Sequence, residues 1–153
     1  MIKKEQGITL IILVVTIIIM LILAGVVIYY SNVVDKSKFQ LIFTNMKLIQ
    51  IKVNMISERT SFDEDKTRYI GEKLKDASNK NEIAGNVLTA EELEDENYYI
   101  YNQETLDSIG LEGIKLAEDE VYIVNYHTLD VIYPKGCVGL DGEVKRKLSE
   151  MLP

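Results

Sequence analysis

The N-terminal part of the chain carries an apolar run from Ile8 to Ile28. No charged residue lies within these 21 residues, and only two threonines and a glycine interrupt the aliphatic side chains. A helix needs about 20 apolar residues to cross a bilayer, and it satisfies its backbone hydrogen bonds internally, as lipid requires. We therefore predict a membrane-spanning helix over residues 8–30. A buried core helix is the poorer alternative, because a chain of 153 residues rarely surrounds a helix that is apolar on all faces.

The pattern then becomes one-sided. Apolar residues recur at intervals of three and four, as on an amphipathic helix, at Phe39, Ile42, Met46, Ile49, Val53 and Ile56. Three further apolar residues broaden this stripe, namely Leu41, Leu48 and Met55. We expect the whole broadened face to be covered by the soluble domain.

The two patterns predict one nearly continuous helix of about 50 residues, roughly 75 Å long at 1.5 Å per residue. No proline lies between Ile8 and Ser57, and Gly25 is the position where the helix could loosen. The alternative is a separate anchor and a separate helix joined near Ser31 and Asn32.

The remaining chain predicts a small head of short helices and strands. The spacing of Tyr69, Ile70, Leu74 and Ala77 predicts a short helix that ends near residues 78–81. Thr89 and Glu92 have the spacing of a capping box. A strand is expected over Tyr98–Tyr101, followed by a helical turn that Asn102 caps and Gly110 closes.

The strongest β signal is a hairpin near the C-terminus. Its predicted strands are Val121–Tyr126 and Val131–Tyr133, with a four-residue loop between them. We expect Pro134 and Gly136 to stop the second strand, and Asp141 to cap a final helix that contains Lys145, Leu148 and Met151. The expected fold class is α+β, with a long N-terminal helix packed on a small head.

Composition narrows the possible partners. The net charge of −7 argues against direct binding of nucleic acid, because phosphate binding needs clustered Lys and Arg. A single cysteine, Cys137, rules out an internal disulfide framework. About 120 residues beyond the anchor suit one domain.

No residue pattern predicts catalysis, a metal site or a cofactor. His127 falls in the hairpin loop and Cys137 in a glycine-rich turn, with no third group to orient a nucleophile–base pair. The acidic triplet Asp63, Glu64 and Asp65 lacks the glycine and the final glutamate of a calcium loop, since Arg68 and Leu74 occupy those positions. We expect a non-enzymatic protein.

Three alternatives account for the N-terminus. A cleaved secretory signal would be cut after Ala24, but its apolar region is normally about 7–15 residues, and this run is longer. An uncleaved signal anchor is the second alternative. The third is a prepilin-type leader, in which MIKKEQG precedes the apolar run and the cut falls after Gly7.

The segment KKEQGITLIILVVTIIIMLILAGVVI resembles the leader of type IV pilins and the related pseudopilins. The resemblance covers about the first 30 residues, and the hairpin resembles the C-terminal hairpin of pilin-like proteins from Gram-positive bacteria. It implies that a prepilin peptidase cuts after Gly7 on the cytoplasmic side and that Ile8 becomes N-methylated. The apolar run then stays on the mature protein as a packing surface for other pilin-like subunits.

Two positions depart from the family pattern. Ile8 is the milder departure, because phenylalanine is the commoner first mature residue. The family usually has a glutamate at the fifth mature residue, where this chain has Ile12. That carboxylate is held to neutralise the N-terminal amine of a neighbouring subunit, and a buried unpaired ammonium is costly. The resemblance therefore implies either a minor or tip subunit, where the family tolerates the loss of the glutamate, or a filament that compensates the charge in another way.

The predicted organisation has four parts. Residues 1–7 are the leader, 8–30 the transmembrane and assembly helix, 31–57 its amphipathic continuation, and 58–153 the head. Lysines flank both ends of the span and do not fix its orientation, whereas the short leader favours a cytoplasmic N-terminus. Residues 31–153 are then extracytoplasmic, on the cytoplasmic membrane or on a filament at the cell surface. The alternative function is an uncleaved single-pass accessory protein.

Overall fold

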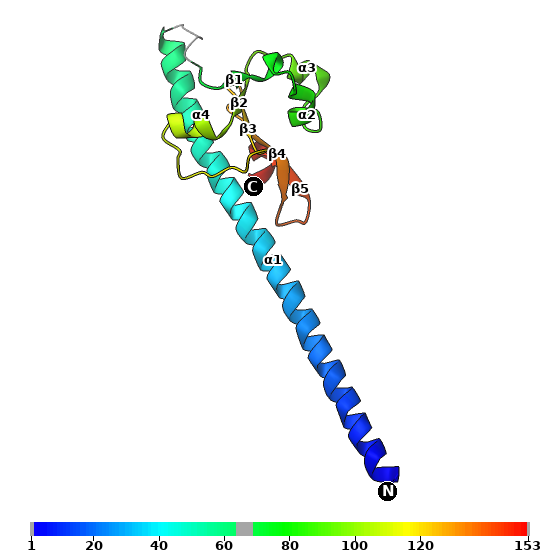
Figure 1. Ribbon diagram of the computed structural model, residues 1–153. Helices are drawn as coiled ribbons and strands as arrows, with labels where there is room; N and C mark the ends of the chain where they lie inside the picture. Colours follow the sequence, from blue (N-terminus) through cyan, green and yellow to red (C-terminus); the bar gives the residue numbers. More distant parts are fainter. Residues whose placement is uncertain (1, 64–68, 153) are drawn as a thin grey trace. The chain divides into compact units, whose positions relative to one another are not determined.

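A computed structural model describes residues 2–63 and 69–152 (Figure 1). It begins with one α-helix of 62 residues, α1 (Ile2–Asp63). The helix runs through residues 29–39 without a break, so the alternative of two separate helices is wrong. It also continues six residues beyond the predicted end at Ser57. The contacts within the chain define two compact units, Met1–Ser37 and Lys38–Pro153.

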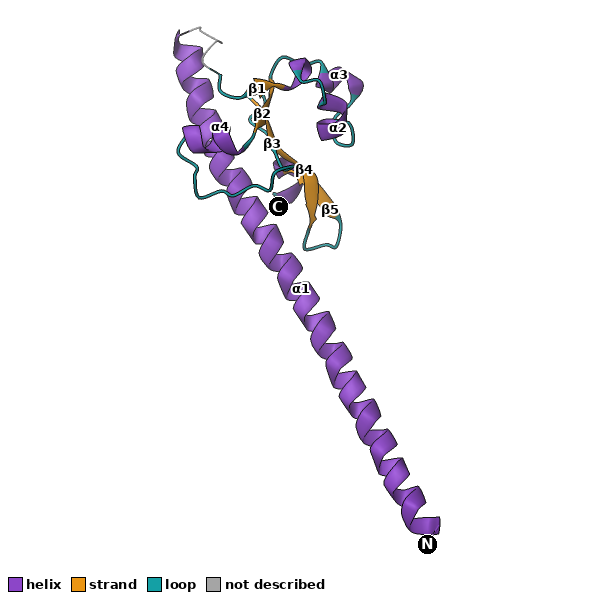
Figure 2. Cartoon of the chain, viewed as in Figure 1, coloured by secondary structure: helices purple, strands orange, loops and turns teal. Residues whose placement is uncertain are grey.

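The second unit contains a five-stranded antiparallel sheet in which each strand pairs with the next along the chain (Figure 2). The strands are β1 (Glu72–Lys73), β2 (Tyr98–Tyr101), β3 (Tyr122–Asn125), β4 (Val131–Val138) and β5 (Val144–Lys147). The central register pairs Tyr99 with Val124 and Ile123 with Ile132. The predicted hairpin is β3 and β4, within a sheet larger than the sequence predicts.

The central strands are buried on both faces because their apolar residues do not alternate with polar ones. All four residues of β2 are buried. Successive side chains point to opposite faces of a strand, so Tyr99 and Tyr101 enter one core while Tyr98 and Ile100 enter another. The sheet therefore needs a covering layer on each side.

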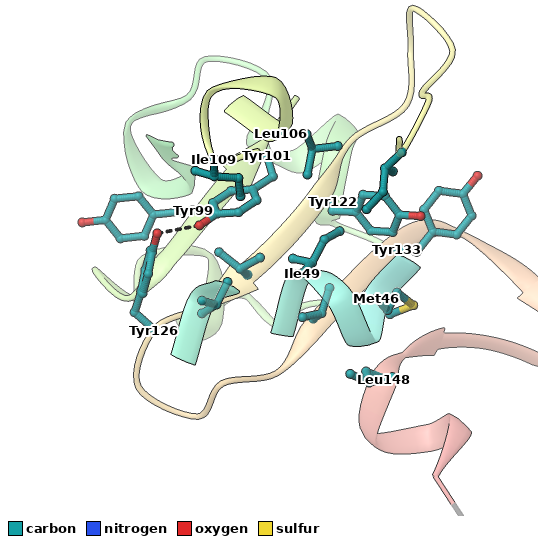
Figure 3. Packing of buried hydrophobic residues seen from close by; sticks show 14 of the residues in the cluster. Met46, Ile49, Tyr99, Tyr101, Leu106, Ile109, Tyr122, Tyr126, Tyr133 and Leu148 are labelled. Atoms are coloured by element: carbon teal, nitrogen blue, oxygen red, sulfur yellow. Dashed lines mark hydrogen bonds between the residues drawn. The ribbon is translucent and has the colours of Figure 1, made fainter. Parts of the chain in front are cut away.

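The α1-side core lies between the sheet and residues 38–63 of α1. Met46, Ile49 and Val53 from the helix are fully buried against tyrosines from the sheet (Figure 3). Phe39, Ile42 and Ile56 are partly buried against the same core, which confirms the predicted stripe. The helix α4 (Gln103–Ser108) contributes Leu106 to this core, and α5 (Leu148–Met151) contributes its first and last residues, Leu148 and Met151.

A smaller α2-side core covers the other face of the sheet. It is closed by the 3-10 helix η2 (Leu74–Asp76) and by α2 (Lys80–Ala84) and α3 (Ala90–Leu93). Two of the three predicted caps are confirmed. Thr89 and Glu92 form a reciprocal capping box on α3, and the Asn102 side chain accepts a hydrogen bond from the Thr105 backbone N–H at the start of α4.

The helix predicted over Tyr69–Ala77 is wrong. Gly71 has a φ of +102°, which ends any regular helix there, and the next two residues form β1 beside β2. The four apolar residues that suggested the helix are split between the two cores: Tyr69 and Ile70 pack on the α1-side core, and Leu74 and Ala77 lie in the α2-side core.

Two predictions about the C-terminus are also wrong. Pro134 and Gly136 do not end β4, because they lie at a register irregularity between Ile132 and Cys137, where the strand tolerates a residue without a backbone donor. The final helix is only α5, since Val144–Lys147 forms a fifth strand. Asp141 lies in the β4–β5 turn, where it accepts a hydrogen bond from the Glu143 backbone N–H.

The expectation that the head covers the broadened stripe on α1 is also wrong. Leu41, Leu48 and Met55 have exposed fractions of 61%, 42% and 42%. They lie on the side of α1 that faces away from Met46, Ile49 and Val53, since residues separated by two or five positions point to different sides of a helix. The head covers only the narrow stripe.

Candidate functional site

The first candidate site is the apolar segment of α1 over residues 8–30. At 1.5 Å per residue it is about 35 Å long, which suits the roughly 30 Å hydrocarbon core of a bilayer. Its large apolar side chains are all exposed, with exposed fractions from 44% at Val26 to 68% at Tyr29. Within the described residues, α1 is the one helix that is long and apolar enough to span a membrane.

The exposure of these side chains distinguishes a membrane-spanning helix from the core helix of a water-soluble protein. The core helix of a water-soluble protein is mostly buried, whereas none of the most apolar window of α1 is buried. This exposure does not fit a buried core helix, which the sequence made the poorer alternative. Length and composition alone also fit a signal sequence near an N-terminus.

Polar groups inside the segment are accommodated locally. The Thr16 hydroxyl donates a hydrogen bond to the Ile12 carbonyl oxygen at 2.6 Å, one turn earlier. A bond of this kind keeps a threonine satisfied where water is absent. At Gly7 and Gly25 an added Cβ would meet nothing within 4 Å, so neither glycine is required by a neighbouring side chain of this chain.

Two adjacent tyrosines end the apolar segment, which is a feature that the sequence analysis did not use. Tyr29 and Tyr30 are 68% and 64% exposed, and their rings lie edge to face with centroids 6.2 Å apart. Tyrosines concentrate at membrane–water interfaces because one end of the ring is apolar and the other is polar. The first charged residues beyond them are Asp35 and Lys36, so the aromatic pair marks the end of the candidate span.

The three positions singled out for processing and assembly all lie on α1. Ile8 and Ile12 are 57% and 61% exposed. They are one turn apart and share a helix face, with Gly7 directly before them. The structure thus places Ile12 one turn after the residue that would become the N-terminus, while cleavage after Gly7 and methylation of Ile8 stay predictions.

The lone histidine and the lone cysteine are not brought together. His127 is exposed in the β3–β4 loop, whereas Cys137 is buried six residues beyond the start of β4, about 20 Å along an extended strand. Burial raises the pKa of the Cys137 thiol, which keeps it protonated and weakly nucleophilic. The geometry gives no thiol–imidazole pair.

The acidic triplet contributes no described site, because Glu64 and Asp65 lie outside the described residues. Among residues 2–63 and 69–152, no group of three potential metal ligands comes together.

The head carries a hollow with a volume of about 480 Å³. We call it the acidic hollow. It is lined by α2, by the loop before β3 and by β4, through Asn79, Glu82, Ile83, Asn86, Glu118, Asp119, Val121, Tyr133, Pro134 and Lys135.

One carboxylate beside the acidic hollow neutralises its lysine. The Lys135 ammonium lies 2.8 Å from a Glu120 carboxylate oxygen, and the Tyr133 hydroxyl donates to the same oxygen at 3.0 Å. The Lys135 contact holds the pKa of Glu120 below its usual range. The three carboxylates in the lining, Glu82, Glu118 and Asp119, therefore set the charge of the hollow.

Taken together, the described residues define an α+β protein with one candidate membrane-spanning helix near its N-terminus. Comparison with known proteins finds no matching family model, no matching curated protein and no matching solved structure.

Proposed function

We propose that this chain is a type IV pilin-like subunit. A prepilin peptidase cuts it after Gly7, and the apolar part of α1 first anchors it in the cytoplasmic membrane and later packs against the helices of like subunits. The head lies outside the membrane and forms the surface that the filament presents.

The observation that carries the proposal is the position of the leader relative to the apolar segment. A short polar and basic leader ends at Gly7, and the apolar run begins at Ile8. A cut at this point discards seven residues and keeps the whole exposed segment, whereas a secretory cut after Ala24 would discard most of it. Retention gives the exposed side chains of residues 8–30 a use as a packing surface.

The continuity of α1 supports the same proposal. A single helix joins the apolar segment to the stripe that packs on the head. In a filament subunit the helix that packs against like subunits also carries the head, and a continuous α1 serves both roles. An anchor that only tethers a domain has no need of this continuity.

The isoleucine at position 12 favours a minor or tip subunit over a major one, and it is also compatible with a second candidate function. Without a carboxylate at this position, the Ile8 ammonium has no paired charge from a neighbouring copy of this chain, and burying it is costly. A minor or tip subunit avoids that cost, since it needs few neighbours of its own kind. The second candidate is an uncleaved single-pass accessory protein, in which Ile8 carries no free amine.

Intact-mass measurement of the membrane-extracted chain separates the two candidates. The chain is expressed in cells that contain an active prepilin peptidase, with a known prepilin as the positive control. A chain that begins at Ile8 with one added methyl group supports the pilin-like subunit. A full-length chain, in cells where the control prepilin is processed, overturns it and supports the uncleaved anchor.

A further inference from the structure

We propose that the outward side of α1 in one copy docks into the acidic hollow of a second copy of this chain. The inference rests on the proposed function, because it supplies a contact between heads in an assembly of like subunits. It concerns residues 38–153 and not the apolar segment.

The first partner surface is an apolar ridge on α1, formed by Leu41, Leu48, Ile51 and Met55. Their exposed fractions lie between 42% and 61%, although the opposite side of the same helix is fully buried. Residues 41, 48 and 55 follow one another at seven-residue intervals, with Ile51 between them. This spacing gives a nearly straight ridge, and a contiguous exposed apolar ridge is a feature of interaction sites.

The charges that flank the ridge are mostly basic. Residues 38–63 contain four basic side chains, Lys38, Lys47, Lys52 and Arg59, against two acidic ones. The partner of an apolar ridge with basic flanks needs an apolar floor and an acidic rim.

The rest of the head offers such a surface. Residues 69–152 contain eighteen acidic and eight basic side chains, a net charge of −10. In the acidic hollow, Ile83, Val121 and Pro134 supply apolar lining. Glu82, Glu118 and Asp119 are exposed at the same place and supply the acidic rim.

The charges also argue against pairing of two ridges. In a parallel pair of helices with a seven-residue repeat, Lys47 of one copy and Lys52 of the other would occupy flanking positions that face each other. Like charges at such positions repel. A ridge therefore fits a hollow better than it fits a second ridge.

The ridge and the acidic hollow are different surfaces of the head. The α1 helix packs on the α1-side core, whereas Ile83 and Val121 of the hollow pack on the α2-side core (Figure 1). A contact between different surfaces of identical chains is heterologous, and it propagates into an open assembly when the rotation does not close a ring. Ridge-in-hollow docking thus adds copies in one direction.

Disulfide cross-linking in membranes tests the docking with full-length chains. Two differently tagged copies are co-expressed, one with Ile51→Cys and the other with Glu82→Cys, and then oxidised. We expect a mixed-tag dimer in several-fold higher yield than for the matched pair Ile51→Cys and Glu104→Cys, because Glu104 is exposed on α4 and does not line the acidic hollow. The wild-type chain gives the baseline, since its one cysteine, Cys137, is buried.

An exchange of charges between the two copies tests whether the docking depends on complementary charge. Adding Lys47→Glu to the Ile51→Cys copy should lower the yield, and adding Glu118→Lys to the Glu82→Cys copy should restore it. Equal yields for Glu82→Cys and Glu104→Cys, or dimers formed mainly between two Ile51→Cys copies, would overturn the docking. The intact mass of the same preparations reports cleavage after Gly7, so failure of the docking and failure of the proposed function are distinguished.

Discussion

The two parts of α1 are both rich in aliphatic residues, yet they differ in how the chain covers them. Over residues 8–30 the large apolar side chains are all exposed, whichever way they point. Over residues 38–63 three residues are fully buried against the head, while Leu41 and Ile51 on the other side are more than half exposed. The helix is continuous through both parts.

This difference shows that the periodicity of the apolar residues, more than their number, decides whether a helix packs against its own chain or against other molecules. A one-sided stripe can be covered by a sheet of the same chain. A segment that is apolar on every side can be covered only by lipid or by other molecules that surround it. Substitutions should therefore have separate effects in the two parts.

The largest expected effect follows from placing charge in the first part. Val14→Lys, Ile18→Lys and Leu21→Lys together should cost about 8–10 kcal/mol of insertion free energy, because each lysine near the centre of a span costs about 2.5–3.5 kcal/mol. The chain should then be lost from carbonate-washed membranes, as immunoblotting would measure. The matched variant Gln40→Lys, Thr44→Lys and Ser61→Lys, at exposed positions of the second part, should stay in the membrane fraction. Equal retention of both variants would contradict the comparison.

A single charge in the buried stripe of the second part should instead unfold the head. Val53→Asp places a carboxylate at a fully buried position, and an unpaired buried charge costs about 3–5 kcal/mol. The head should lose its protection in hydrogen exchange while the chain stays in the membrane. Thr44→Asp, which puts the same charge on the exposed side of α1, is the control and should leave the exchange pattern unchanged.

Alkaline pH should destabilise the head by a smaller amount. Burial raises the pKa of Tyr122 to about 12, whereas a tyrosine in an unfolded chain titrates near 10. This contribution, on the order of 2 kcal/mol, is complete below pH 10 and disappears as the pH rises through about 12. Denaturant unfolding monitored by tyrosine fluorescence should show that loss, and Tyr122→Phe should reduce the pH dependence. An unchanged profile in that variant would refute the assignment to Tyr122.

The smallest effect should come from the cap of α3, far along the chain from α1. Thr89→Ala removes the side chain that accepts the hydrogen bond from the Glu92 backbone N–H, and loss of such a cap costs about 1 kcal/mol. Denaturant unfolding should detect this cost, while membrane retention should not change. Glu91→Ala, at an exposed position within α3, is the control, and an equal effect of both substitutions would argue against the cap.

Local signals in the sequence predicted the elements whose causes are local. The α1 stripe follows from spacing, the α3 and α4 caps follow from side chains three residues from their partners, and β2 follows from four consecutive β-favouring residues. The candidate span follows from composition alone. Each of these causes lies within a few turns or one strand.

The failures lie where distant pairing decides the structure. Tyr69, Ile70, Leu74 and Ala77 have helical spacing, but the sheet distributes them between two cores. Strand β5 is VKRK, and charged residues are typical of a strand at the edge of a sheet. Neither the edge pairing of β5 nor the continuation of β4 past Pro134 can be deduced from local pattern.

The candidate sites also divide into those that the sequence predicts and those that only the fold brings together. Gly7, Ile8 and Ile12 lie within six residues of one another in the sequence, so their places on α1 could be predicted. The apolar ridge could not be predicted, because the spacing of Leu41, Leu48 and Met55 also fits a wider buried stripe. Only the fold shows which side of α1 the sheet covers. The acidic hollow combines α2, β4 and the loop before β3, which only the fold brings together.

The central claim, that the apolar part of α1 is kept because the cut precedes it, is tested most directly by comparing intact masses of the wild-type chain and Gly7→Ala. Both are expressed in cells with an active prepilin peptidase and extracted from the membrane. The account predicts that the wild-type chain begins at a methylated Ile8 and that Gly7→Ala keeps residues 1–7, with both chains in the membrane. Identical N-termini in the two chains, or a wild-type chain cut after Ala24, would contradict it.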